Sequence, residues 1–128
     1  YDVLAVNPAS LAARRDDWAK VVDVWYRVVD YFHDPATRAD AIAIMAARVG
    51  VKPEAYAAFV DGTKILTREE ASRYFQKADG FGSLYGSSKI ADDFNVANKV
   101  YDTPQEIDAY IDASLTVQRR AVNAPLVV

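Results

Sequence analysis

The sequence contains no cysteine, a single histidine and no long run of apolar residues. The absence of cysteine excludes disulfide bonds and thiolate metal sites. No apolar run approaches the ~20 residues that a membrane-spanning helix needs. The sequence also shows no signal-peptide pattern. These absences exclude a disulfide scaffold, a zinc-thiolate module and an integral membrane segment.

An excess of basic charge is also lacking. Fifteen Lys and Arg residues stand against eighteen Asp and Glu residues, for a net charge of -3. Nucleic-acid binding relies on clustered basic charge that neutralises phosphates. Here the basic residues are scattered, and only Arg14-Arg15 and Arg119-Arg120 are adjacent. We therefore predict that nucleic acid is not a partner.

The strongest pattern present is an apolar period of three and four over Asp16 to Phe32. Such a period is typical of a helix with one buried face. Both tryptophans of the chain lie in this segment. The side chains predicted to form its buried face are Trp18, Val21, Val22, Trp25, Val28, Val29 and Phe32.

Caps and prolines predict further helices on both sides of this segment. Two capping boxes, in which Thr and Glu bond each other's free backbone N–H groups, are predicted at Thr67–Glu70 and Thr103–Glu106. The second opens a helix through Ile107, Tyr110 and Ile111. The other expected helices cover Pro8 to Arg14, Pro35 to Val49, Pro53 to Asp61 and Ser83 to Asn95.

The expected fold class is therefore mostly α. One short buried strand is predicted at Asp2 to Val6, because this run is rich in Val and Leu. Ala124 to Val128 forms either a second, edge strand or a loose tail. The composition does not change along the 128 residues, so we expect a single domain or a fragment of one.

Residues with chemical potential do not form a catalytic or metal-binding pattern. His33 is expected at the end of the long helix, without a serine or threonine that it could activate. The pairs Asp16-Asp17 and Glu69-Glu70 lie at predicted helix starts, where acidic residues are common. Asp92-Asp93 is expected to face water. We predict no catalytic residue, no metal ligand, no cofactor and no enzymatic activity.

One glycine-bearing loop is a candidate binding site. Gly80, Phe81, Gly82 and Ser83 precede a predicted helix, whose free N–H groups together with Ser83 could hold a small anion. The spacing of the glycines differs from the dinucleotide fingerprint, and the loop follows a helix rather than a strand. The alternative is a simple loop with a helix cap at Ser83.

The succession of segments resembles a known family. ILTREEASRYFQ followed by GSLYGSSKIADDFNVANKVYDTPQEIDAYIDASL is similar to the C-terminal end of ABC-importer substrate-binding proteins of the nitrate/sulfonate/taurine type, which are related to thiamine-pyrimidine-precursor binders. Upstream, the strand, short helix and tryptophan-containing long helix follow the same order. The matching positions are Ser83-Leu84-Tyr85, Lys89 to Phe94, Val100, Pro104 and Ile111 to Leu115.

This resemblance implies the helical C-terminal portion of a periplasmic-binding-protein type II α/β fold. Such proteins have two lobes and a ligand cleft between them, and they are longer than this chain. The sheet partners of Asp2 to Val6 would then belong to the missing lobe or to a second chain. The family binds its ligand mainly through loops of both lobes that this chain does not contain.

The resemblance also implies a function. The protein would bind a small anion or a sulfonate-like or pyrimidine-like compound, close around it, and dock to a membrane permease. The expected location is periplasmic or extracytoplasmic. One form of such a protein is a lipoprotein anchored to the membrane.

Two alternatives remain open. The chain could be a self-contained helical interaction module whose exposed apolar faces bind a partner or a second copy. A compact, stable monomer in sedimentation would count against the fragment hypothesis. The chain could also be an enzyme, since relatives with this fold include pyrimidine-synthesis proteins. That alternative requires a catalytic cluster around His33.

Overall fold

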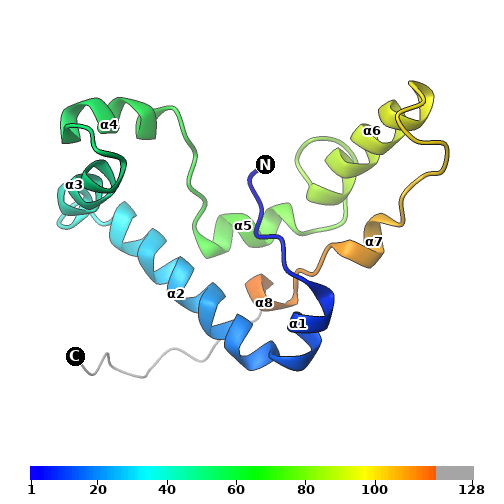
Figure 1. The fold of residues 1–128 in the computed structure, drawn as a ribbon, viewed down its shortest axis with the longest axis horizontal. Coiled ribbons are helices and arrows are strands. Elements are labelled where there is room, and N and C mark those ends of the chain that lie inside the picture. Colours follow the sequence, from blue (N-terminus) through cyan, green and yellow to red (C-terminus); the bar gives the residue numbers. More distant parts are fainter. Residues whose placement is uncertain (118–128) are drawn as a thin grey trace. The chain divides into compact units, whose positions relative to one another are not determined.

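The computed structural model describes residues 1–117 of the chain and shows a helical protein (Figure 1). Within these residues there are eight helices and no strand. They are α1 (Pro8–Ala13), α2 (Arg15–His33), α3 (Arg38–Val49), α4 (Pro53–Asp61), α5 (Arg68–Tyr74), α6 (Leu84–Ala97), α7 (Ile107–Tyr110) and α8 (Ser114–Val117). The mostly α fold class is thus confirmed.

The chain divides into two compact units. Unit 1 runs from Tyr1 to Ala71, and unit 2 begins at Ser72. The boundary falls within α5. We describe each unit separately.

The core of unit 1 lies where α2, α3 and α4 meet. Phe32, Ala41 and Val60 are buried there, one from each helix. Half-buried apolar side chains pack around these three, namely Ile42, Met45, Tyr56 and Ile65. Burying such side chains is the main favourable term in folding, so this cluster holds the three helices together.

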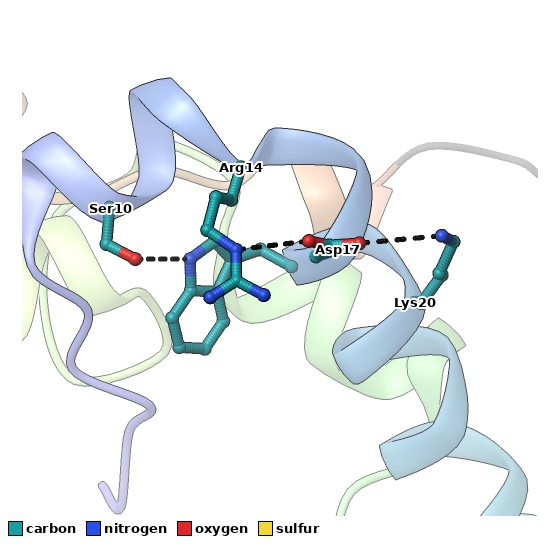
Figure 2. A network of polar contacts seen from close by, with 5 residues as sticks. Ser10, Arg14, Asp17 and Lys20 are labelled. Atoms are coloured by element: carbon teal, nitrogen blue, oxygen red, sulfur yellow. Dashed lines mark hydrogen bonds and ion pairs between the residues drawn. The ribbon is translucent and has the colours of Figure 1, made fainter.

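The corner between α1 and α2 is fixed by polar contacts (Figure 2). The Asn7 side chain caps α1 by accepting from the Ala9 and Ser10 N–H groups. The indole N–H of Trp18 donates to Ser10 Oγ at 3.1 Å. On the exposed side, Asp17 pairs with Arg14 at 3.1 Å and with Lys20 at 3.5 Å. The Arg14 contact is the first cause of the lowered pKa of Asp17.

The buried face of α2 differs from the predicted one. Tyr26, Val29 and Phe32 are buried, as expected for the last two, but Trp25 is 56% exposed. Val21 and Val28 are also exposed, so the prediction was wrong for these three residues. Arg68 covers the side of α2 that carries Asp23 and Tyr26, with its guanidinium 4.5 Å from the Tyr26 ring centre and 2.6 Å from the Asp23 carboxylate. The side that carries Trp25 is buried only at its C-terminal end, where Phe32 meets Ala41 and Val60.

We call this outward face of α2 the outer stripe. It consists of Val21, Val24, Trp25, Val28 and Tyr31, all exposed. Their spacing of three and four residues places them along one side of the helix. Phe32 continues this side seven residues after Trp25 and is buried, so the described residues cover this side of α2 only at its C-terminal end.

The predicted strand at Asp2 to Val6 is not formed. No regular structure is assigned to these residues, and Leu4 is 62% exposed. A strand is stabilised by hydrogen bonds to a neighbouring strand, and none lies within residues 1–117. The expected strand or tail at Ala124 to Val128 lies outside the described residues.

Two helix starts can be compared with their predicted caps. The capping box at Thr67–Glu70 is confirmed, with Thr67 N–H donating to Glu70 at 3.0 Å and Glu70 N–H donating to Thr67 Oγ1 at 3.2 Å. The expected helix from Pro35 begins later, at Arg38. The turn before it is held by the Asp34 carboxylate, which accepts from the Ala36 N–H.

Unit 2 is built on α6. Ser83 caps this helix, as predicted, by accepting from the Tyr85 N–H at 3.1 Å. The expectation that Asp92 faces water was wrong, because its side chain lies in the buried part of the helix. Its neighbour Asp93 is exposed and pairs with Lys89 at 2.9 Å.

The second capping box, at Thr103–Glu106, is not formed. Asp92 accepts the backbone N–H of Gln105 at 3.1 Å, which fixes the chain just before the helix start. Helix α7 therefore begins at Ile107 with no side-chain cap and ends at Tyr110, one residue short of the predicted Ile111. A buried carboxylate from α6 thus holds the segment before α7, while the helix itself has no side-chain cap.

Candidate functional site

The predicted binding loop, Gly80 to Ser83, leads into the first turn of α6. Ser83 is buried, and its hydroxyl donates to the Gln76 carbonyl at 2.6 Å while accepting from the Tyr85 N–H. Its proton is therefore engaged inside the protein. This arrangement is the loop and cap that the sequence offered as the alternative. Binding of an anion by Gly80, Phe81, Gly82 and Ser83 stays a prediction.

Glycine allows this loop to lie directly on α6. Gly80 has φ of 79°, a left-handed conformation that favours glycine. At Gly86, an added Cβ would lie 2.4 Å from the Gly80 carbonyl oxygen. The loop backbone thus contacts the helix where a side chain would otherwise stand. Phe81, in the same loop, is largely exposed.

Beside this loop, unit 2 contains an open cleft of about 520 Å³. This volume is within the range of roughly 300–1,000 Å³ that is typical of small-molecule sites. One wall is the segment before Gly80 together with α6, and the other is the start of α7. The lining residues are Lys77, Ala78, Asp79, Tyr85, Gly86, Lys89, Glu106, Ile107 and Asp108.

Charged side chains meet across this cleft. Lys77 Nζ lies 2.8 Å from the Asp108 carboxylate and 5.2 Å from the centre of the Tyr85 ring. The hydrogen bond to Asp108 raises the pKa of Lys77. Lys89 turns to Asp93, and that bond raises the pKa of Lys89. Both lysines are therefore fully charged at neutral pH.

Asp92 positions the far wall of the cleft. Its carboxylate accepts from the Tyr101 hydroxyl at 2.8 Å and from the Gln105 N–H at 3.1 Å. Asn95 donates to the same tyrosine oxygen at 3.3 Å. Because Gln105 immediately precedes Glu106, this network determines where the acidic residues of the second wall lie.

A second, smaller pocket lies in unit 1 beside His33, with a volume of about 240 Å³. The His33 Nε2 atom is 2.8 Å from the Ile65 carbonyl oxygen, so this nitrogen is a donor. Thr63 lines the same pocket, which the sequence did not suggest, but its hydroxyl donates to the Phe59 carbonyl. His33 and Thr63 therefore do not form a pair of general base and nucleophile.

The charged residues of the His33 pocket are engaged with one another. Arg38 stacks over the Phe32 ring at 4.4 Å and pairs with Asp61 at 3.3 Å. Lys64 pairs with Glu70, which also belongs to the α5 capping box. This pocket is held by structural contacts, so we consider the cleft of unit 2 the better candidate site.

Residues 1–117 contain no group of three or more His, Asp or Glu side chains that could hold a metal ion. In the same part of the chain, no helix has the length and apolar character required to cross a bilayer.

Comparisons with family models, curated proteins and solved structures found no match.

The sequence prediction found the loop of the candidate site and missed the cleft beside it. Lys77, Lys89 and Asp108 were not singled out, because each looks like an ordinary surface charge. The Lys77–Asp108 ion pair and the packing of α6 against α7 bring them together in the folded chain. Gly86, four residues after Gly82, was the one available signal of a close backbone approach.

Proposed function

We propose that this chain is the helical C-terminal part of a solute-binding protein that serves an ABC importer of the nitrate/sulfonate/taurine type. The ordered succession of family-like segments from Asp2 to Leu115 supports this assignment. The solute is a small anion or a sulfonate-like or pyrimidine-like compound. The protein works outside the cytoplasm, in the periplasm or as an anchored lipoprotein, and its action is binding, not catalysis.

The observation that carries this proposal is the outer stripe of α2. Five exposed apolar residues on one helix face, including Trp25, form a patch of the kind that proteins bury against a partner. Val3 and Leu4, from the segment with strand-like composition, are exposed in the same unit. A remaining lobe with a β-sheet would offer an apolar face for the stripe and an edge for this segment.

The mechanism follows from the two-lobed architecture that the resemblance implies. The ligand binds between the lobes, the lobes close over it, and the closed form docks to the permease. In this proposal the described helices form the cover of one lobe. The loop at Gly80 to Ser83 is the part of this chain assigned to the ligand, through the backbone N–H groups at the start of α6.

Isothermal titration of the intact gene product tests the proposal directly. The probes are nitrate, taurine, an alkanesulfonate and an aminopyrimidine, each at up to millimolar concentration. We expect one-to-one, saturable binding of one of them, accompanied by an increase in the melting temperature. Absence of binding to all four would contradict the proposed ligand class.

A helical interaction module is the second candidate, because an exposed apolar face such as the outer stripe is also found where proteins bind a partner or a second copy. Sedimentation equilibrium of the 128-residue chain separates the two. Self-association that is lost in the variant Trp25→Ser but kept in Phe59→Ser would favour the module. Phe59 is the control because it is an exposed aromatic residue of the same unit outside the stripe.

A further inference from the structure

The ammonium group of Lys77 lies in the lining of the unit 2 cleft and is held there by other residues of the chain. Lys77 Nζ contacts the Asp108 carboxylate at 2.8 Å on one side and faces the Tyr85 ring at 5.2 Å on the other. A carboxylate combined with an aromatic face is how proteins recognise alkylammonium and quaternary ammonium ions. Lys77 thus occupies the position that such a ligand would take.

The ion pair that keeps Lys77 in this position is weak. The side chains of Lys77 and Asp108 are 63% and 67% exposed, and exposed ion pairs contribute little net free energy. Lys77 is attached through a flexible four-carbon chain, so its ammonium can leave without moving the backbone. The Tyr85 ring and Asp108 would then be open to a cation from solution.

The rest of the cleft favours a cation over an anion. Lys89, the other basic residue in the lining, pairs with Asp93, which lies outside the lining. The remaining charged lining residues are Asp79 and Glu106. With Lys77 displaced, the cleft presents an aromatic ring and three carboxylates, those of Asp79, Glu106 and Asp108, against one lysine that is already paired.

Two contacts that do not involve Lys77 hold the walls of the cleft in place. The backbone of residues 78–80 lies against Gly86, and the Asp92 carboxylate fixes Gln105, directly before the second wall. Both contacts involve backbone atoms, so they do not depend on Lys77. The cleft can therefore keep its shape when this side chain swings out.

We propose that the unit 2 cleft binds a small organic ammonium ion at the position between Tyr85 and Asp108 that Lys77 otherwise fills. This site is independent of the proposed function: it uses only residues of unit 2 and requires neither a second lobe nor a permease. The Lys77 ammonium group competes with this ligand for the same position.

The test is a titration of the 128-residue chain, followed by NMR chemical shifts of the α6 and α7 amides. The probe is choline, and its control is 3,3-dimethylbutan-1-ol, which has the same shape without the charge. We expect saturable shifts around Tyr85 and Asp108 with choline and none with the neutral alcohol. Equal shifts with both compounds would overturn the proposal.

Substitutions sharpen the test because they act in opposite directions. Lys77→Ala removes the competitor and should tighten choline binding about two- to fivefold. Asp108→Asn and Tyr85→Leu remove the two recognition groups and should each weaken binding by about two- to fivefold or more. A Lys77→Ala variant that binds choline equally or more weakly would contradict the proposal.

Lys64→Ala is the matched control. Lys64 is a similarly exposed lysine, 65% against 63%, that pairs with a carboxylate in unit 1. Choline affinity should not change in this variant. An equal gain in Lys64→Ala and Lys77→Ala would show that only net charge matters, and would overturn the proposed site. Circular dichroism confirms that each variant is folded.

Discussion

The two units of this protein bury different kinds of residue. In unit 1 the buried side chains are apolar or aromatic, with Phe32, Ala41 and Val60 at the meeting point of three helices. In the described part of unit 2 they are small or polar, namely Ser83, Gly86, Asp92 and Thr116. Unit 1 is therefore stabilised mainly by apolar burial, and unit 2 by specific hydrogen bonds and a close backbone contact.

This difference has a physical consequence. Apolar burial is non-directional and tolerates small shifts, whereas a hydrogen-bonded carboxylate and a glycine contact depend on geometry. Unit 1 should lose stability in proportion to the apolar volume removed. The stability of unit 2 should fall markedly when a substitution removes one hydrogen-bonding atom or adds one Cβ, and the shape of its cleft should change as well.

The largest expected effect is that of Phe32→Ala. Removing this buried ring leaves a cavity in the core of unit 1 and should lower the free energy of unfolding by about 3–5 kcal/mol. Urea unfolding followed by circular dichroism measures the change. Phe59→Ala, at an exposed position in the same unit, should stay within about 0.5 kcal/mol. Similar losses in both variants would show that the cluster at Phe32 is not the core.

Gly86→Ala tests the close contact in unit 2. A Cβ here would lie 2.4 Å from the Gly80 carbonyl oxygen and 2.5 Å from that of Ala78, so the loop must move. The expected cost is about 1–3 kcal/mol, with faster amide hydrogen exchange in α6. Gly82→Ala is the control, because nothing lies within 4 Å of its added Cβ. Unchanged exchange in the Gly86 variant would contradict the contact.

Asp92→Ala tests the polar support of the second wall. The change leaves the Tyr101 hydroxyl and the Gln105 N–H without their acceptor and should cost about 1–3 kcal/mol. The exposed Asp93→Ala loses only its pair with Lys89 and should cost about 0.3–0.5 kcal/mol. Hydrogen exchange at Gln105 measures the loss at the site itself. Equal protection of this amide in both variants would argue against the network.

The smallest effect is a dependence on pH at the start of α5. The Thr67 N–H is the first cause of the lowered pKa of Glu70, and Lys64 contributes as well. A lowered pKa in the folded state means that the stabilisation is present at neutral pH and is lost as the pH falls through this pKa. The variant Glu70→Gln should show a flatter loss of stability between neutral and acidic pH. An unchanged profile would mean that the capping box does not contribute.

Local signals in the sequence predicted much of this fold. The Thr67–Glu70 box and Ser83 each form the predicted cap, because a cap requires only residues within one turn. The box at Thr103–Glu106 failed although its pattern was equally good. Asp92, thirteen residues before Gln105, binds the N–H of this residue, which lies between the two box residues, and such a contact depends on how the chain folds back.

Orientation was harder to predict than helix formation. The apolar period over Asp16 to Phe32 correctly predicted a helix, but not which part of its apolar side is buried. That depends on Ala41 and Val60, which come from later helices that fold back onto α2 at Phe32. The cleft of unit 2 was missed for the same reason. Its charged residues come from segments that meet only in the folded chain.

The positions of the two tryptophans have an optical consequence. Trp18 is half-buried and hydrogen-bonded to Ser10, whereas Trp25 is exposed on the outer stripe. One indole should therefore resist quenching by iodide while the other is quenched readily. Anything that covers the outer stripe would shield Trp25 and shift its emission to the blue. The chain thus carries an intrinsic fluorescent reporter on the surface whose partner is in question.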